Sequence, residues 1–402
     1  MGQPKKDNIR SEQLQGLRNL GAMRTLLQSL HEVGCARDKA GNRQLHMSDY
    51  CLLVLAWLYN PIIDSLRGLQ QASALSQVQK RLGVGRASLG SLSESVRVFD
   101  PDALAELAAE LSAKLPERSP ERFAAVKKRP TAVDGSVFKL LVQIGKLAWL
   151  PRSGGGATCG YRMHAQFEIF RSTTHRIDVT GANPRKEADE RAVLARTLEA
   201  GRCYLLDRGF QKYSLWDAIH ETKSEYVCRL HDNTPYQVVQ ERALTAEDRA
   251  AGVLSDQLVR FGTPNSRTRP PQHPTRLVIV QAKPHNSRRS KNGVSGPNCD
   301  GFLRLVTDNL ELPAQIVAEL YRLRWTIELF FRMIKQLLGC RHLLSTHPEG
   351  VTIQLYMAII ACIMILALTG KMPTKRTYEM ICHYLAGWAS LEELEAHIQK
   401  LP

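Results

Sequence analysis

The order of strand-like and helix-like segments in the middle of the chain constrains its fold more than any other feature. At Pro130 the pattern changes, and residues 132–142 (AVDGSVFKLLV) alternate and are rich in β-forming side chains. The strand-like runs that follow are 163–170, 176–179, 203–206 and 226–230, and helix-like segments at 188–199 and 215–221 precede the last two. Three strands with short turns, followed by alternating helix and strand, predict a mixed α/β sheet.

Helical patterns dominate the sequence before this region. From about Ser11 to Ala125, apolar residues recur at helical spacing, beginning with Leu14, Leu17 and Leu20. Residues 78–96 contain two short helical segments around a glycine-containing turn at 83–85. That spacing is equally consistent with a DNA-binding helix-turn-helix and with an ordinary helical hairpin.

Residues 233–297 interrupt the α/β pattern. Pro, Arg, Ser and Asn accumulate there around strand-like runs at 236–240 and 276–281, which predicts an inserted β-rich module. Its basic residues are Arg260, Arg267, Arg269, Arg276, Lys283, Arg288, Arg289 and Lys291. Such a surface could follow the backbone of DNA, and the alternative is a solvated loop.

The charge of the chain points to a polyanionic partner. Lys and Arg number 54 against 39 Asp and Glu, a formal net charge of +15. Nucleic acid is the first candidate and an acidic membrane surface the second. The nine cysteines form no C-x-x-C pair, which is typical of reduced thiols and predicts a cytoplasmic, nucleoid-associated protein.

One apolar stretch, residues 351–369, is long enough to be compared with a membrane span. It only just reaches the required length of about 18–20 residues, contains Gln354, and is the only such stretch in the sequence. These features favour a buried helix, so no membrane partner is expected.

Two aspartates stand out against apolar surroundings. Asp134 lies within an otherwise apolar strand, where a carboxylate is costly to bury and needs a partner such as a metal ion. Asp207 directly follows the apolar run 203–206, so it is expected at the carboxyl end of a strand, where α/β sheets place ligands. Either residue alone could be a turn or cap residue.

A third acid lies in residues 313–339, which we predict to form one long helix. On such a helix Tyr321, Arg324, Glu328 and Lys335 share an arc of about 60°. The adjacent Trp325 would face away from them, toward the core. A glutamate between Arg and Lys is by itself typical of a solvated ion-pair stripe. With the two aspartates, it completes a set of three acids.

Three carboxylates suit hard divalent cations. Mg²⁺ or Mn²⁺ prefer carboxylate oxygens, and a pair of such ions can activate a water or a 3′-hydroxyl and stabilise the leaving oxygen. The pattern therefore predicts a two-metal phosphodiester site.

The motifs around these acids resemble those of bacterial insertion-sequence DDE transposases. Their signature Y-x2-R-x3-E-x6-K is matched at every spacing by YRLRWTIELFFRMIK, residues 321–335. The first aspartate lies in VDGS at 133–136, and the second in DRGF at 207–210. The resemblance covers about residues 130–370.

This resemblance implies a role for each matching residue. Asp134, Asp207 and Glu328 would be the catalytic metal ligands. The residues expected to hold DNA are Tyr321, Arg324, Lys335 and Arg208. The implied fold is an RNase-H-like core with a β-rich insertion, flanked by helical regions. The boundaries predicted are 1–129 for a helical DNA-end-binding region, 130–231 and 304–370 for the core, 232–303 for the insertion and 371–402 for a helical carboxyl-terminal region.

The implied substrate is double-stranded DNA, both the terminal inverted repeats of an element and the target, held by a homodimer in the synaptic complex. Some members stack a flipped base on a tryptophan of the inserted domain, but this chain has no Trp between Trp216 and Trp325. Tyr236 and Phe261 are weak substitutes for that stacking role. Whether cleavage passes through a hairpin therefore stays open.

Other functions remain as alternatives. A catalytically silent DNA-binding inhibitor or domesticated derivative, or an RNase-H-like nuclease without strand transfer, would share the same fold. Cys340, His342 and His347 are close enough in sequence to suggest zinc, but no fourth ligand has standard spacing. The glycine-rich residues 151–160 lack the Gly-Lys-Ser/Thr of a phosphate-binding loop, which favours a hairpin loop.

Overall fold

The structure is a computed structural model, and it describes residues 23–39, 41, 43–60, 62–139, 160–181, 189–262, 269–283, 300–337, 343–345, 347–372 and 374–400. The chain forms two compact units. Unit 1 comprises Met1–Leu115, Phe138–Tyr161 and Phe330–Pro402, and unit 2 comprises Pro116–Val137 and Arg162–Leu329. The sheet and the three predicted acids belong to unit 2.

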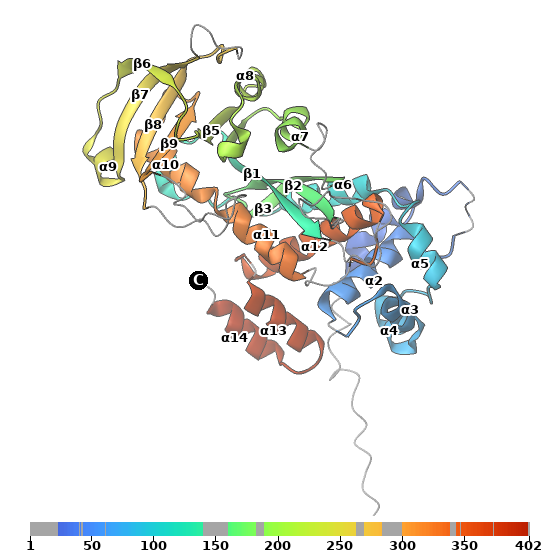
Figure 1. Cartoon of the computed structure of the whole chain (residues 1–402). Helices are drawn as coiled ribbons and strands as arrows, with labels where there is room; N and C mark the ends of the chain where they lie inside the picture. The colour runs from blue at the N-terminus through green and yellow to red at the C-terminus, as the bar shows by residue number, and fades with distance from the viewer. Residues whose placement is uncertain are drawn as a thin grey trace, which may run out of the picture. The chain divides into compact units, whose positions relative to one another are not determined.

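Unit 2 is organised around one mixed sheet of nine strands in the order β3-β2-β1-β4-β5-β9-β8-β7-β6 (Figure 1). The strands are β1 (Arg129–Lys139), β2 (Gly160–Glu168), β3 (Thr173–Gly181), β4 (Arg202–Leu206), β5 (Glu225–Arg229), β6 (Tyr236–Glu241), β7 (Val253–Phe261), β8 (Thr275–Gln281) and β9 (Phe302–Thr307). Strands β1, β4 and β5 run parallel, whereas β5, β9, β8, β7 and β6 pair antiparallel in turn. The prediction of a mixed α/β fold is confirmed.

The strands of the predicted insertion extend this same sheet. β6 and β8 correspond to the two strand-like runs of the sequence, and β8 joins the sheet by pairing with β9. Sequence patterns missed β7 and the short helix α9 (Ala246–Ala250). β7 was missed because its burial does not follow its sequence pattern. Asp256 is buried, although a regular alternation of polar and apolar residues would place it in solvent.

Two helices cover one face of the sheet. α7 (Glu190–Arg196) and α8 (Tyr213–Glu221) supply Leu194, Leu215, Trp216 and Ile219 to a core that they share with buried residues of β1, β4, β5, β7, β8 and β9. Trp216 is fully buried and stacks on Tyr226 with ring centroids 5.3 Å apart. Burying such an aromatic side chain contributes roughly 4–6 kcal/mol.

The predicted long helix at 313–339 is two helices, α10 (Ala314–Leu323) and α11 (Thr326–Leu337). Between them the hydrogen bonds tighten from the α-helical to the 3₁₀ pattern, as in Arg324 N to Tyr321 O at 3.1 Å. The Thr326 hydroxyl also donates to the Leu323 carbonyl at 2.8 Å, which stabilises the turn. Trp325, predicted to be core, lies in this turn and is 51% exposed, so that prediction was wrong.

Unit 1 is helical. Its α-helices include α2 (Met47–Tyr59), α3 (Leu66–Ala74), α4 (Ser76–Leu82), α5 (Leu89–Ser95), α6 (Pro101–Ala113), α12 (Pro348–Thr369), α13 (Lys375–Leu385) and α14 (Leu391–Gln399). α4 and α5 are the two segments predicted around the glycine turn, in which Gly83 adopts φ +67° and Ser88 caps α5. Both Arg86 and Ser88 are exposed, which leaves a helix-turn-helix role open.

The apolar stretch forms α12, which is long and apolar enough to cross a membrane by length and composition. In unit 1, however, it packs against α2 and α6, and 78% of its most apolar part is buried. Gln354 is fully buried and satisfied: its Oε1 accepts from Leu344 N at 2.8 Å, and its Nε2 donates to Gly350 O at 2.9 Å. This agrees with the interpretation of a core helix.

Candidate active site

The two aspartates lie level with each other on adjacent parallel strands. The register pairs Thr131 with Tyr204 and Ala132 with Leu205. One two-residue step further along both strands come Asp134 and Asp207, so their side chains leave the same side of the sheet. Asp207 directly follows β4, at the strand end expected from the sequence.

Backbone groups next to each aspartate orient its carboxylate. Asp134 Oδ1 accepts from Gly135 N at 2.7 Å, and Asp207 Oδ1 accepts from Gly209 N at 2.7 Å. The second contact caps the short 3₁₀ turn η7 (Arg208–Phe210). These bonds leave the other oxygen of each group to face further partners.

Arg324 brings the third acid to this pair. Its Nη1 lies 3.7 Å from Asp134 Oδ2, and its Nη2 donates to Glu328 Oε1 at 2.9 Å. The Arg324 guanidinium also lies 5.9 Å from the centre of the Tyr321 ring. The structure therefore gathers Tyr321, Arg324 and Glu328 near Asp134, with Arg324 in contact with the carboxylates of both Asp134 and Glu328.

The electrostatics of this group favour cations. Burial raises the pKa of Asp134 to about 6, against the Gly135 N–H and Arg324, which lower it. Asp207 and Glu190 raise the pKa of Asp134 further. Neighbouring carboxylates are stabilised by a nearby positive charge, and their hard oxygen atoms are the donors that Mg²⁺ and Mn²⁺ prefer. The donor set fits a divalent metal.

Two of the predicted DNA-binding residues, Arg208 and Lys335, are not part of this group of side chains. Arg208 is exposed in η7, directly after Asp207. Lys335 is exposed about two turns beyond Glu328 on α11, in the part that belongs to unit 1, with its Nζ 5.6 Å from the centre of the Phe138 ring. Their roles in binding DNA stay predictions.

The basic surface of the insertion is smaller than predicted. Arg276 is 1% exposed and forms a two-point ion pair with Asp256, at 2.7 and 2.8 Å, so it cannot follow a DNA backbone. Arg260, Arg269 and Lys283 are exposed, as predicted. The other four basic residues of the prediction, Arg267, Arg288, Arg289 and Lys291, lie outside the described residues.

Neither suggested base stacker is well placed. Phe261 is 2% exposed and packs against Trp216 and Tyr213, so that suggestion was wrong. Tyr236 is partly buried against the same core. A flipped base would need another partner.

The zinc and glycine-loop alternatives fall largely outside the described part of the chain. Cys340, His342 and residues 151–159 are not among the described residues. His347 is described, and its Nε2 accepts from Arg97 Nε at 3.2 Å. That hydrogen bond gives His347 a structural role at the start of α12.

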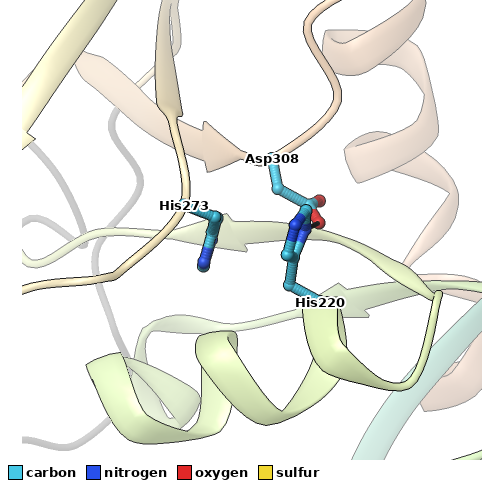
Figure 2. A group of neighbouring side chains, drawn as sticks. All are labelled: His220, His273 and Asp308. Atoms are coloured by element: carbon cyan, nitrogen blue, oxygen red, sulfur yellow. Dashed lines mark hydrogen bonds and ion pairs between the residues drawn. The ribbon is translucent and has the colours of Figure 1, made fainter.

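A second cluster of potential ligands consists of His220, His273 and Asp308 (Figure 2). His220 Nδ1 donates to Asp308 Oδ2 at 2.9 Å, while His273 contacts Asp217 Oδ1 through Nδ1 and the Tyr226 hydroxyl through Nε2, both at 3.0 Å. The two imidazole rings stack 4.5 Å apart with planes 11° from parallel. Because an imidazole lone pair lies in the ring plane, rings stacked face to face do not direct both lone pairs at one ion. We interpret the cluster as a set of hydrogen bonds that hold together α8, the segment before β8 and the end of β9.

His164 on β2 leads to a prediction about pH. Burial, with Arg162 and Arg196 adding to it, lowers the pKa of His164 to about 4, and Asp178 and Asp189 oppose the shift only in part. Because the pKa of His164 is lower in the folded than in the unfolded protein, the neutral ring favours folding. This contribution to the unfolding free energy is complete above pH 6.5, near the unfolded pKa, and is lost as the pH falls toward 4. We expect this residue to cost at most about 3 kcal/mol of unfolding free energy over that window.

Urea unfolding between pH 4 and 8 measures this effect. The His164→Gln variant should show a shallower loss of stability in the acid limb than the parent protein. Identical pH profiles for the two proteins would contradict the assignment.

Comparison with known proteins places the chain in a family. The family described as Transposase DDE domain matches residues 126–364, more than half of the chain, and the protein belongs to this family. The matched range contains all seven predicted site residues. The resemblance to bacterial insertion-sequence DDE transposases, inferred from three motifs, is thereby confirmed.

Curated relatives have matching descriptions. The chain is 31% identical over 222 residues to a Sinorhizobium fredii protein described as transposase y4zB, covering 55% of this chain and 56% of that protein. It is 27% identical over 228 residues to a Geobacillus stearothermophilus protein described as a transposase for insertion sequence element IS5377, covering 56% and 53%. It is 24% identical over 238 residues to the Escherichia coli transposase for insertion sequence element IS421, covering 52% and 61%. The chain thus spans little more than half the length of these relatives.

A solved structure of piggyBac transposase in a synaptic complex with hairpin DNA aligns with 97% of this chain and 85% of that chain. The sequence identity is 12% and the TM-score 0.39, which is too low to establish a common fold.

Proposed function

We propose that this chain is a transposase that binds the terminal inverted repeats of an insertion sequence, cleaves DNA at the ends of the element and joins the freed 3′-hydroxyls to target DNA. The observation that carries the proposal is that Arg324 contacts both Asp134 and Glu328, within the unit that also places Asp207 at the end of the neighbouring strand β4. The strand order β3-β2-β1-β4-β5, with β1, β4 and β5 parallel, supports an RNase-H-like core for this site.

The residues suit a metal-dependent reaction. Asp134, Asp207 and Glu328 would hold two Mg²⁺ or Mn²⁺ ions, which supply Lewis acidity and activate the attacking hydroxyl. Arg324 has five N–H donors, so it can hold a phosphate oxygen while it orients Glu328. Tyr321, nine-tenths buried beside Arg324, limits the space in which that guanidinium can move.

The partners follow from the reaction. Both ends of an element must be held before they are joined to one target, so we propose a homodimer in the synaptic complex. The net charge of +15 supports binding to DNA phosphates. We place this activity in the cytoplasm, on nucleoid DNA.

One experiment tests the proposal directly. The purified full chain is incubated with labelled DNA carrying the ends of its element, a target plasmid and Mg²⁺, and the products are sized. Nicked ends together with joined products would support transposase activity. Nicking without joined products would indicate a nuclease, and stable binding without nicking would indicate a silent DNA-binding derivative.

The exposed basic residues of the insertion yield a prediction about salt. Replacing Arg260, Arg269 and Lys283 by glutamine should weaken DNA binding and flatten its dependence on salt. Each lost phosphate contact should lower the slope of log K against log salt by about 0.9. Titrations at several salt concentrations measure the slope.

A control with the same change in net charge replaces Lys375, Arg376 and Lys400, which are exposed in the carboxyl-terminal helical region, by glutamine. It should leave the slope close to that of the parent protein. Equal effects of the two triple variants would assign the insertion charges to general solvation.

A further inference from the structure

We propose that Glu190 is a fourth carboxylate of the metal centre and ligates a divalent cation together with Asp134. The inference rests on the proposed function and extends it to a residue that no motif of the sequence marks. Glu190 opens α7, where an acidic residue is ordinary, so the sequence alone offers no reason to single it out.

The first observation is how closely Glu190 approaches the strand of the first aspartate. A Cβ atom added to Gly135 would lie 2.5 Å from Glu190 Oε1 and 3.1 Å from Glu190 Cδ. A side chain at position 135 would thus collide with this carboxylate. A larger residue after Asp134 would therefore displace the Glu190 carboxylate from its place against this backbone.

The second observation is a cavity that the two carboxylates share. Asp134 and Glu190 line it together with Gln166 from β2. Gln166 is 4% exposed, and its Oε1 has no hydrogen-bond partner among the described residues. The cavity is small, about 10 Å³, which is room for about one ion or water molecule. A buried oxygen without a donor is costly, and a cation at the edge of this cavity, or a water molecule bound to it, would offset that cost.

The third observation is the balance of charge. Arg162 contacts Glu190 as Arg324 contacts Glu328. Each glutamate is thus held by one arginine. Two guanidinium groups against four carboxylates leave a deficit of positive charge that divalent cations would balance.

The simpler alternative is that Glu190 only forms an ion pair with Arg162. Such a partly exposed pair, with both side chains about a quarter exposed, contributes about 0–1 kcal/mol and has no reason to affect metal binding. Glu199 provides a matched control, because it too pairs with an arginine, Arg202, at 2.9 Å, and also contacts His175 at 2.8 Å. It follows the carboxyl-terminal end of α7, whereas Glu190 is its first residue.

Calorimetric titration of the full chain with Mn²⁺, without DNA, separates these possibilities. We expect Glu190→Gln to weaken Mn²⁺ binding about tenfold or more, as Asp134→Asn should, and Glu199→Gln to leave it unchanged. Glu190→Asp keeps the charge but shortens the side chain. It should therefore retain the unfolding temperature of the parent protein and still bind Mn²⁺ more weakly.

The outcomes distinguish a failure of the role of Glu190 from a failure of the metal centre. Parent-like Mn²⁺ affinity in both Glu190 variants, with loss in Asp134→Asn, would overturn the role of Glu190 and leave the proposed function standing. Parent-like affinity in Asp134→Asn as well would overturn the metal centre itself. A loss in Glu199→Gln equal to that in Glu190→Gln would also overturn the proposal, since the effect would then be structural.

Discussion

Replacing Asp134 or Glu328 by alanine should abolish nicking at element ends while DNA binding persists. The expected loss of rate is on the order of 10³-fold or more, since a removed ligand forfeits several kcal/mol of charge stabilisation. Binding should survive because phosphate contacts come mainly from basic residues, whereas these two side chains are acidic. Gel-shift titration measures binding, and sizing of labelled ends measures nicking.

Asp300→Asn is a suitable control for this experiment, because Asp300 is an exposed acid that pairs with Arg304 and is remote in sequence from the motifs. It should nick like the parent protein. Full nicking by either Asp134→Ala or Glu328→Ala would remove that residue from the site.

The second large effect is expected in the stability of the sheet extension. Arg276→Met should lower the free energy of unfolding by about 3–5 kcal/mol, because Asp256, 4% exposed, would lose its two-point partner. Arg276 also donates to the carbonyl oxygen atoms of Leu312 and Asn309, at 2.6 and 3.3 Å, and these contacts tie β8 to the segment before α10. Urea unfolding measures the loss.

Two further variants make this prediction specific. Arg304→Met removes an arginine from a more exposed pair and should cost no more than about 1 kcal/mol. Adding Asp256→Leu to Arg276→Met removes the buried carboxylate, which would otherwise keep Arg242 at 3.4 Å as a weaker partner, and should recover part of the loss. If Arg276→Met and Arg304→Met cost the same, the buried pair is not the cause.

Local patterns in the sequence predicted most of the strands, though not β7 or β9, and they singled out the two aspartates. Alternation and β-forming residues predicted β1 and β4. The predicted ends of both strands lie within a few residues of the ends in the structure. Asp207 could be placed at a strand end because an apolar run stops directly before it. Such inferences succeed because strand geometry repeats every two residues and needs no distant partner.

The turn between α10 and α11 could not be predicted in the same way. The sequence there has no Pro or Gly, so a continuous helix was the natural expectation. The break instead depends on tightened hydrogen bonds and on the hydroxyl of Thr326, which occupies the Leu323 carbonyl. Trp325 lies in this break and is exposed, and the neighbouring Arg324 contacts both Asp134 and Glu328.

The sequence also could not predict which charged residues are buried. Arg276 and Arg260 are both basic and lie on neighbouring strands, yet one is buried in an ion pair and the other is exposed. Charge patterns do not distinguish these cases, because the partner Asp256 is distant in sequence and is reached only by strand pairing.

The sequence by itself determined the family and the mixed α/β fold and predicted the three acids, because motif spacing and two-residue periodicity are properties of short stretches of chain. Only the tertiary structure decided which charges meet. It placed Asp134 and Asp207 on neighbouring parallel strands or their ends, joined Glu328 to Asp134 through Arg324, and brought Glu190 against Gly135. Electrostatic interactions act through space, so residues far apart in sequence become one site only when the sheet and helices have packed.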